Sequence, residues 1–199
     1  MIKIAAAALI VFLSTIAVAE DATVRTIMLT DLGDIEIDVY VDKAPISAAN
    51  FLQLVDGGHL DGGTFYRVVS YENDKGSPKI EVIQGGLNVE EGPFPPIEHE
   101  TTEQTGILHT DGVISMARGD VGTASTEFFI VLGDQPALDY GEVRNPDEQG
   151  FAAFGKVVSG MDVVRAINES PADGPSDSDY TKGQMLTEPV AIIGVKRAK

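Results

Sequence analysis

Short strands in which apolar residues occupy every second position restrict this chain to a mainly β fold. In the segment 35–41, isoleucine or valine alternates with acidic residues or tyrosine, which is the pattern of a strand with one buried face. The segment 25–30 and the turn 31–34 precede it, so we expect a β-hairpin at the start of the folded chain. Further short strands are predicted at residues 64–69, 80–84, 112–117, 127–132, 151–158 and 190–195.

Only two segments have the pattern of a helix. In the segment 45–56, Pro45 suits the first helical position, an apolar face follows, and Gly57 and Gly58 end the helix. The second helix is predicted at 161–169. Many short strands, glycine-rich turns and two helices together predict a closed antiparallel β-barrel.

Composition predicts one domain and narrows the range of partners. The chain has 199 residues, of which 43% are hydrophobic, and no repeat or break in composition divides it. Its net charge of −17 disfavours nucleic acid and anionic membrane surfaces as partners. The absence of cysteine excludes disulfides, thiolate metal sites and a cysteine nucleophile.

The first 19 residues have the pattern of a cleaved export signal. Lys3 precedes an apolar run from Ile4 to Ile16, and Ala17-Val18-Ala19 forms a small-residue cleavage site. The competing interpretation is a membrane anchor, but the run is short for a span of about 20 residues. We therefore expect a mature domain at 20–199, exported to the periplasm without stable membrane association.

Two polar residues interrupt strands that are otherwise apolar. Arg67 follows Phe65 and Tyr66, and Gln84 lies between an apolar pair and two glycines. A buried guanidinium or amide is costly unless it is paired or has a function. These two residues therefore mark a candidate site.

The motifs around these residues resemble the cyclophilins, a family of peptidyl-prolyl cis-trans isomerases. The similarity is closest to the exported bacterial branch and runs from about Arg25 to the end of the chain. It is carried by Phe65-Tyr66-Arg67, Ile83-Gln84-Gly85-Gly86, Ile114-Ser115-Met116-Ala117-Arg118, Glu127-Phe128-Phe129-Ile130 and Phe154-Gly155-Lys156-Val157. The resemblance implies an eight-stranded barrel with a helix at each end, proline-containing polypeptides as substrates, and no cofactor. We also expect a monomer.

The resemblance also implies a role for individual residues. Arg67 would donate a hydrogen bond to the prolyl nitrogen, Gln84 would orient Arg67 and bind the substrate backbone, and Phe129 would form a wall of the proline pocket. Val82 and Leu138 would complete that wall, while Ala117 and Arg118 would present their backbone to the residue before the proline. Phe151 would also bind substrate, at a position where the family often has histidine and its bacterial members often have tyrosine.

Three residues and one loop depart from the family pattern. Glu81 stands where a pocket phenylalanine is common, Glu127 replaces a glutamine, and Ala137 replaces a tryptophan or phenylalanine at the rim. The loop Ser70–Lys79 is longer than the usual connection. These departures leave a second function open, a chaperone that binds proline segments with weak or no isomerase activity.

Glu127 carries a specific hypothesis. If its strand alternates regularly, Glu127 shares a face with Phe129 and its carboxylate competes with the substrate for Arg67. The sequence then predicts that Glu127→Gln raises kcat/KM.

Other chemistries have little support in the sequence. His59, His99 and His109 lack the spacing of metal ligands, so no metal site is expected. No histidine is predicted close to a plausible nucleophilic serine, which argues against a serine triad.

Overall fold

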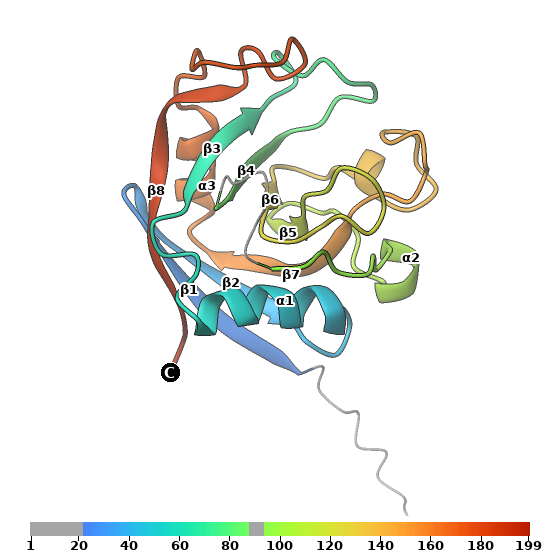
Figure 1. The fold of residues 1–199 in the computed structure, drawn as a ribbon, viewed down its shortest axis with the longest axis vertical. Helices are drawn as coiled ribbons and strands as arrows, with labels where there is room; N and C mark the ends of the chain where they lie inside the picture. The colour runs from blue at the N-terminus through green and yellow to red at the C-terminus, as the bar shows by residue number, and fades with distance from the viewer. Residues whose placement is uncertain (1–21, 88–93) are drawn as a thin grey trace, which may run out of the picture.

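The computed structural model describes residues 22–87 and 94–199, and the predicted signal segment 1–19 lies outside them. Eight antiparallel strands close into a barrel in the order β1-β2-β7-β5-β6-β4-β3-β8 (Figure 1). The strands are β1 (Thr23–Thr30), β2 (Gly33–Tyr40), β3 (Thr64–Val69), β4 (Val82–Gly86), β5 (Val113–Met116), β6 (Phe128–Val131), β7 (Ala152–Ser159) and β8 (Met185–Arg197). The predicted mainly β fold and closed eight-stranded antiparallel barrel are confirmed.

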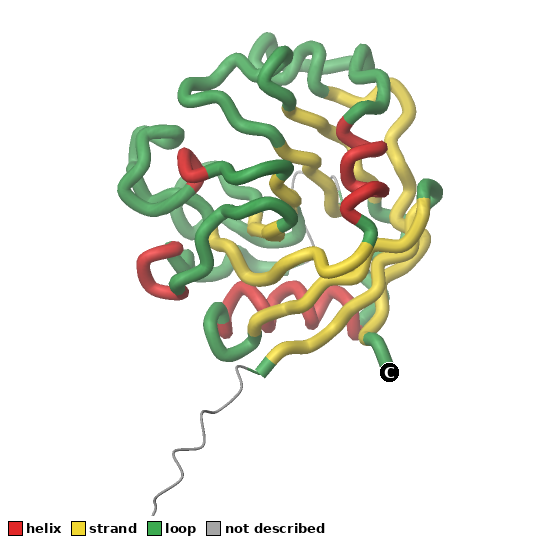
Figure 2. Tube along the Cα trace, turned by 180° about the vertical axis from the view of Figure 1, so that it is seen from behind, coloured by secondary structure: helices red, strands yellow, loops and turns green. Residues whose placement is uncertain are grey.

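Two helices cover the barrel from different sides (Figure 2). Helix α1 (Pro45–Asp56) packs on β2, β7 and β8, and α3 (Met161–Asn168) packs on β2, β3 and β4. Phe51 of α1 is fully buried and meets the rings of Phe128 and Phe154. None of the helices in the described part of the chain is long and apolar enough to cross a bilayer.

The chain contains some ordered structure where the sequence predicts only loops. A short helix, α2 (Thr102–Thr105), begins with a capping box between Thr101 and Gln104. A 3-10 turn, η1 (Pro136–Leu138), follows β6. These elements have too few residues to show a hydrophobic period, so the sequence pattern does not reveal them.

The last strand begins five residues before its predicted start at Val190. Pro189 and its polar neighbours indicate a loop, because proline cannot donate to a strand ladder. In the structure these residues lie at an irregularity, where Phe65 pairs with Val190 but Arg67 pairs with Met185. Pro189 is accommodated there because the regular ladder is already interrupted.

A β-bulge in β3 lies at the same point. Phe65 pairs with Gly85 and Arg67 with Gln84, so Tyr66 is the extra residue. A side chain at Gly85 would meet the Thr64 carbonyl oxygen at 2.7 Å, so glycine is required for β4 to approach the bulge. Bulges re-aim side chains, and this one determines the direction of Arg67.

Candidate active site

Strand register brings the three predicted catalytic residues together. Arg67 on β3 pairs with Gln84 on β4, and Gln84 pairs with Phe129 on β6. The preceding residue, Phe128, points into the barrel and meets Phe51 and Phe65. Because side chains alternate along a strand, one face of these strands builds the core and the other builds the site.

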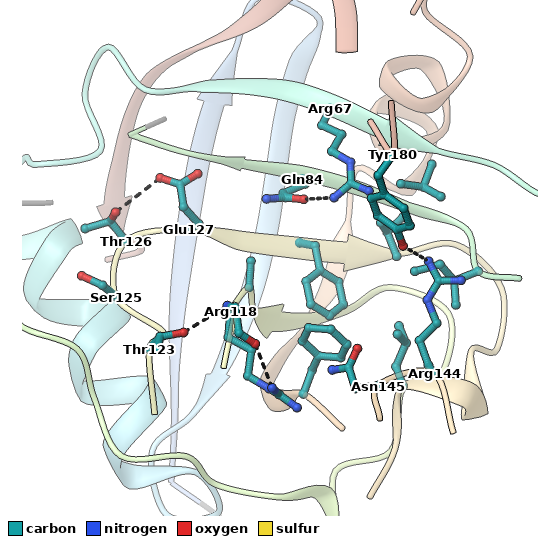
Figure 3. Close-up of a pocket in the computed structure, with 18 residues that line it drawn as sticks. Arg67, Gln84, Arg118, Thr123, Ser125, Thr126, Glu127, Arg144, Asn145 and Tyr180 are labelled. Atoms are coloured by element: carbon teal, nitrogen blue, oxygen red, sulfur yellow. Dashed lines mark hydrogen bonds between the residues drawn. The ribbon is translucent and has the colours of Figure 1, made fainter. Parts of the chain in front are cut away.

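A cavity of about 410 Å³ lies over this row (Figure 3). All nine residues that the sequence predicts for the site line it: Arg67, Val82, Gln84, Ala117, Arg118, Glu127, Phe129, Leu138 and Phe151. Other lining residues were not predicted, among them Ile80, Arg144, Asn145 and Tyr180. The cavity therefore combines the expected wall with a second wall from loops distant in sequence.

Two glutamines hold the Arg67 guanidinium. Nη1 donates to Gln84 Oε1 at 2.9 Å, while Nε and Nη2 donate to Gln184 Oε1 at 3.0 and 2.7 Å. An arginine has five N–H bonds. Among the described residues, one N–H on each terminal nitrogen has no acceptor and can therefore bind a ligand. Burial lowers the pKa of Arg67 below its ordinary value, but a guanidinium still carries its charge at neutral pH.

Glu127 contacts Tyr66 and not Arg67. Gln84 Nε2 donates to the Tyr66 hydroxyl at 2.8 Å, and that hydroxyl donates to Glu127 Oε2 at 2.7 Å. Burial, followed by the adjacent carboxylate, raises the pKa of Tyr66 well above its ordinary value. The expected competition for Arg67 is therefore wrong, because the β-bulge places the Tyr66 hydroxyl where it takes up the carboxylate.

The chain of hydrogen bonds through Tyr66 fixes the orientation of the Gln84 amide. Since the Tyr66 proton goes to Glu127, the hydroxyl oxygen accepts from Gln84 Nε2, and Gln84 Oε1 must then face Arg67. A carboxylate anchors this arrangement better than a neutral amide because charge-assisted hydrogen bonds are stronger.

We expect Glu127→Gln to lower kcat/KM, opposite to the expectation from sequence. A neutral acceptor in place of the carboxylate should cost about 1 kcal/mol of transition-state stabilisation, which is roughly a five-fold lower rate. Tyr66→Phe interrupts the same chain, so the double variant should lose no more than Tyr66→Phe alone. Steady-state measurements on a proline peptide test this, and a faster Glu127→Gln enzyme would restore the idea that the carboxylate restrains Arg67.

Two phenylalanines form the apolar floor of the cavity. The rings of Phe129 and Phe151 meet edge to face, with centroids 5.2 Å apart. The Arg118 guanidinium lies 5.2 Å from the centre of the Phe151 ring and forms an ion pair with Asp147 at 2.8 Å. The side chain of Arg118 is thus engaged in structure, which leaves its backbone for the predicted contact with substrate.

A buried serine and histidine, with a partly buried aspartate, support Phe129 from behind. His109 stacks on the Phe129 ring, with its ring nitrogens 3.0 Å from Ser115 Oγ and 2.7 Å from Asp139 Oδ1. The sequence did not predict this grouping. Ser115 is fully buried and does not line the cavity, so the grouping cannot reach a substrate and serves to hold the aromatic floor.

Two of the departures from the family pattern lie outside the cavity. Glu81 faces a separate hollow beside Glu72 and Asn168, and Ile80 and Val82 provide the apolar wall where a phenylalanine was expected. Ala137 lies in η1 against the core, and its neighbour Leu138 lines the cavity. The two residues therefore do not place a charge or a gap beside Arg67.

The residues that sequence reasoning missed come from the loops before β4, β7 and β8. Gln184 is fully buried and its Nε2 donates to the Asn73 carbonyl oxygen at 3.0 Å, which directs its Oε1 to Arg67. Tyr180 lies over Arg67, and Arg144 donates to the Tyr180 hydroxyl. These residues occur in polar, turn-rich segments. The one sequence signal for Gln184 was an amide residue directly before a strand.

Comparison with known proteins agrees with this geometry. Residues 25–196 match the family model described as cyclophilin-type peptidyl-prolyl cis-trans isomerase. A peptidyl-prolyl cis-trans isomerase of Acinetobacter baylyi is 35% identical over 174 residues, which cover 85% of this chain and 82% of the relative. Peptidyl-prolyl cis-trans isomerase A of Dickeya dadantii is 33% identical over 189 residues, covering 92% and 89%.

A solved structure shares the fold. The cyclophilin-type isomerase of Cryptosporidium parvum superposes with a TM-score of 0.66 at 17% identity, covering 89% of this chain and 99% of its own. The barrel, the row of Arg67, Gln84 and Phe129, and the match over residues 25–196 lead to one conclusion. This chain belongs to the cyclophilin-type peptidyl-prolyl cis-trans isomerase family.

Proposed function

We propose that this chain catalyses cis-trans isomerisation of X-Pro bonds in proteins that fold after export. The isomerase activity follows from the family and from the site; the exported setting rests on the pattern of residues 1–19 and on similarity to bacterial relatives. We assign the chain to the exported bacterial branch and expect it to act as a periplasmic monomer.

The observation that carries the activity is an arginine that keeps two donors unused among the described residues, above an apolar floor. Rotation of an X-Pro bond faces a barrier of about 18–20 kcal/mol because the amide is conjugated. As the bond twists, the prolyl nitrogen becomes pyramidal and gains a lone pair. A hydrogen bond from Arg67 then stabilises the twisted state more than the planar state, which lowers the barrier.

The cavity holds the proline in place for this step. The rings of Phe129 and Phe151, together with Val82 and Leu138, offer an apolar pocket for the pyrrolidine ring. Gln84 and Gln184 fix the guanidinium beforehand, so the donor needs no reorganisation as the bond twists.

The alternative, a chaperone that binds proline segments without isomerising them, loses its support. It depended on Glu81, Glu127 and Ala137 disturbing the pocket, but Glu127 is bound by Tyr66 and the other two lie outside the cavity. Exchange spectroscopy on a short Ala-Pro peptide with catalytic amounts of protein decides between the two. Faster exchange supports the isomerase, and binding without faster exchange supports the chaperone.

The predicted export signal leads to a separate test. In a bacterial host, the full-length gene product should be recovered from the periplasm as a chain that begins at Glu20, because Ala17-Val18-Ala19 fits signal peptidase. Intact-mass measurement of the periplasmic fraction tests this. A full-length chain in the membrane fraction would support the anchor interpretation and contradict the proposal.

A further inference from the structure

The long loop Ser70–Lys79 supports the second wall of the cavity, where Arg144 and Tyr180 line it. Three consecutive residues of this loop, Asn73 to Lys75, hold the segment 179–184. Asn73 and Lys75 bind its backbone, and Asp74 acts through Arg144. Asn73 Nδ2 donates to the Gly183 carbonyl oxygen at 3.1 Å, and Lys75 Nζ donates to the carbonyl oxygens of Asp179 and Lys182. The backbone on both sides of Tyr180 is therefore clamped by this loop.

The remaining residue of the three, Asp74, secures the Tyr180 side chain through Arg144. Asp74 and Arg144 form a two-pronged ion pair with distances of 2.7 and 2.9 Å, and the Asp74 side chain is fully buried. Arg144 Nη2 also donates to the Tyr180 hydroxyl at 3.0 Å. Since Arg144 is held on one side by Asp74, it fixes the hydroxyl on the other.

This arrangement presents Tyr180 as a ready donor. Its ring lies over the Arg67 guanidinium, 5.8 Å from ring centre to Cζ, while the residue remains 46% exposed. The hydroxyl accepts from Arg144, and its own proton has no acceptor within residues 22–87 and 94–199. A hydroxyl that accepts from a cation becomes a better donor because hydrogen bonds in a chain polarise one another.

The position of Tyr180 indicates which part of a substrate it meets. Arg118 and Thr123 lie at one end of the cavity, and Tyr180 and Arg144 lie at the other, beyond the aromatic floor (Figure 3). If the residue before the proline lies along the backbone of Ala117 and Arg118, the chain after the proline leaves toward Tyr180. The first carbonyl groups of that segment then come within reach of the hydroxyl.

We propose that Tyr180 is a substrate-binding residue that donates a hydrogen bond to the backbone of the segment following the proline. Asp74 and Arg144 are its positioning residues. The proposal rests on the isomerase activity of the site and adds a second anchor point, so that longer polypeptides bind better than segments ending at proline.

The test compares Tyr180→Phe on two peptides, acetyl-Ala-Ala-Pro-amide and acetyl-Ala-Ala-Pro-Ala-Ala-amide. The variant keeps the ring over Arg67 and removes only the hydroxyl. We expect KM for the longer peptide to rise by about five-fold, the scale of one hydrogen bond, with kcat unchanged and no change in KM for the shorter peptide. A purely structural role of Tyr180 would alter both peptides equally.

Tyr140→Phe serves as the matched control, because Tyr140 is 40% exposed and does not line the cavity. It should leave both peptides unaffected. An unchanged KM for the longer peptide in Tyr180→Phe, or an equal rise for both peptides, overturns the proposal. If the wild-type protein failed to isomerise either peptide, the proposed function would be at fault and not the role of Tyr180.

Discussion

Arg67→Ala should abolish most isomerase activity while the barrel stays folded. Removing one preorganised electrostatic donor costs about 2.7–4 kcal/mol in the transition state, which corresponds to roughly 100- to 1,000-fold in kcat. Arg67 lies beside a cavity, so water can occupy its place and satisfy Gln84 and Gln184. Exchange spectroscopy on an Ala-Pro peptide measures the loss, and thermal unfolding checks the fold.

Two variants control this experiment. Arg197→Ala removes an arginine of β8 that pairs with Asp56 on the surface, outside the cavity, and should keep full activity. Arg67→Lys keeps a positive charge but lacks the planar fork that both glutamines hold, so it should recover little activity. Wild-type rates in Arg67→Ala would refute the mechanism.

Asp74→Ala should give the largest loss of stability among single changes around the site. The variant leaves the Arg144 guanidinium, whose side chain is 7% exposed, without its carboxylate. Breaking a buried pair in this way costs about 3–5 kcal/mol, which lowers Tm by roughly 6–20 °C for a domain of this size. The N–H groups of Gly76 and Ile80 also lose their acceptor.

A double variant distinguishes the cost of leaving a buried charge unpaired from the loss of the contacts that support the loop. Asp74→Ala with Arg144→Ala removes both charges, so it should be more stable than Asp74→Ala alone. A double variant that loses the sum of both single effects, or a single variant with native Tm, would show that the ion pair does not support the loop.

Acid should weaken this ion pair. Burial by itself would raise the pKa of Asp74, but the hydrogen bonds from Arg144 and from the Gly76 and Ile80 N–H groups outweigh it and hold the pKa below its ordinary value. The stability from this carboxylate is then complete above about pH 4, the pKa of an aspartate in an unfolded chain. It is lost as the pH falls through the lower folded pKa.

Local patterns predicted the elements of this protein well. Alternation in 35–41, the proline and paired glycines around 45–56, and the short apolar runs elsewhere identified all eight strands and both long helices. Such patterns depend on neighbours in sequence, and a half-buried strand shows its period within a few residues. Arg67 and Gln84 were equally visible, because a charged or amide side chain inside an apolar strand is conspicuous, and the family resemblance supplied the other predicted site residues.

The partners of those site residues depended on the tertiary structure. The bulge at Tyr66 directs its hydroxyl to Glu127, and no local pattern distinguishes that bulge from a regular strand. Regular alternation correctly placed Glu127 on the cavity face with Phe129, but the carboxylate meets Tyr66 and not Arg67. The family resemblance, and not the alternation, suggested a cavity position for Glu81, whereas Ile80 and Val82 line the cavity.

The sequence by itself determined that this chain forms a mainly β barrel, because the period of two along each strand is a local property, and its resemblance to the cyclophilins implied that Arg67, Gln84 and Phe129 share one site. Only the tertiary structure decided how Arg67 is held and what faces it across the cavity. Gln184 and Tyr180 lie more than 110 positions from Arg67 along the chain. Contacts between loops so far apart arise from how the closed barrel brings their ends together, and no local pattern encodes that.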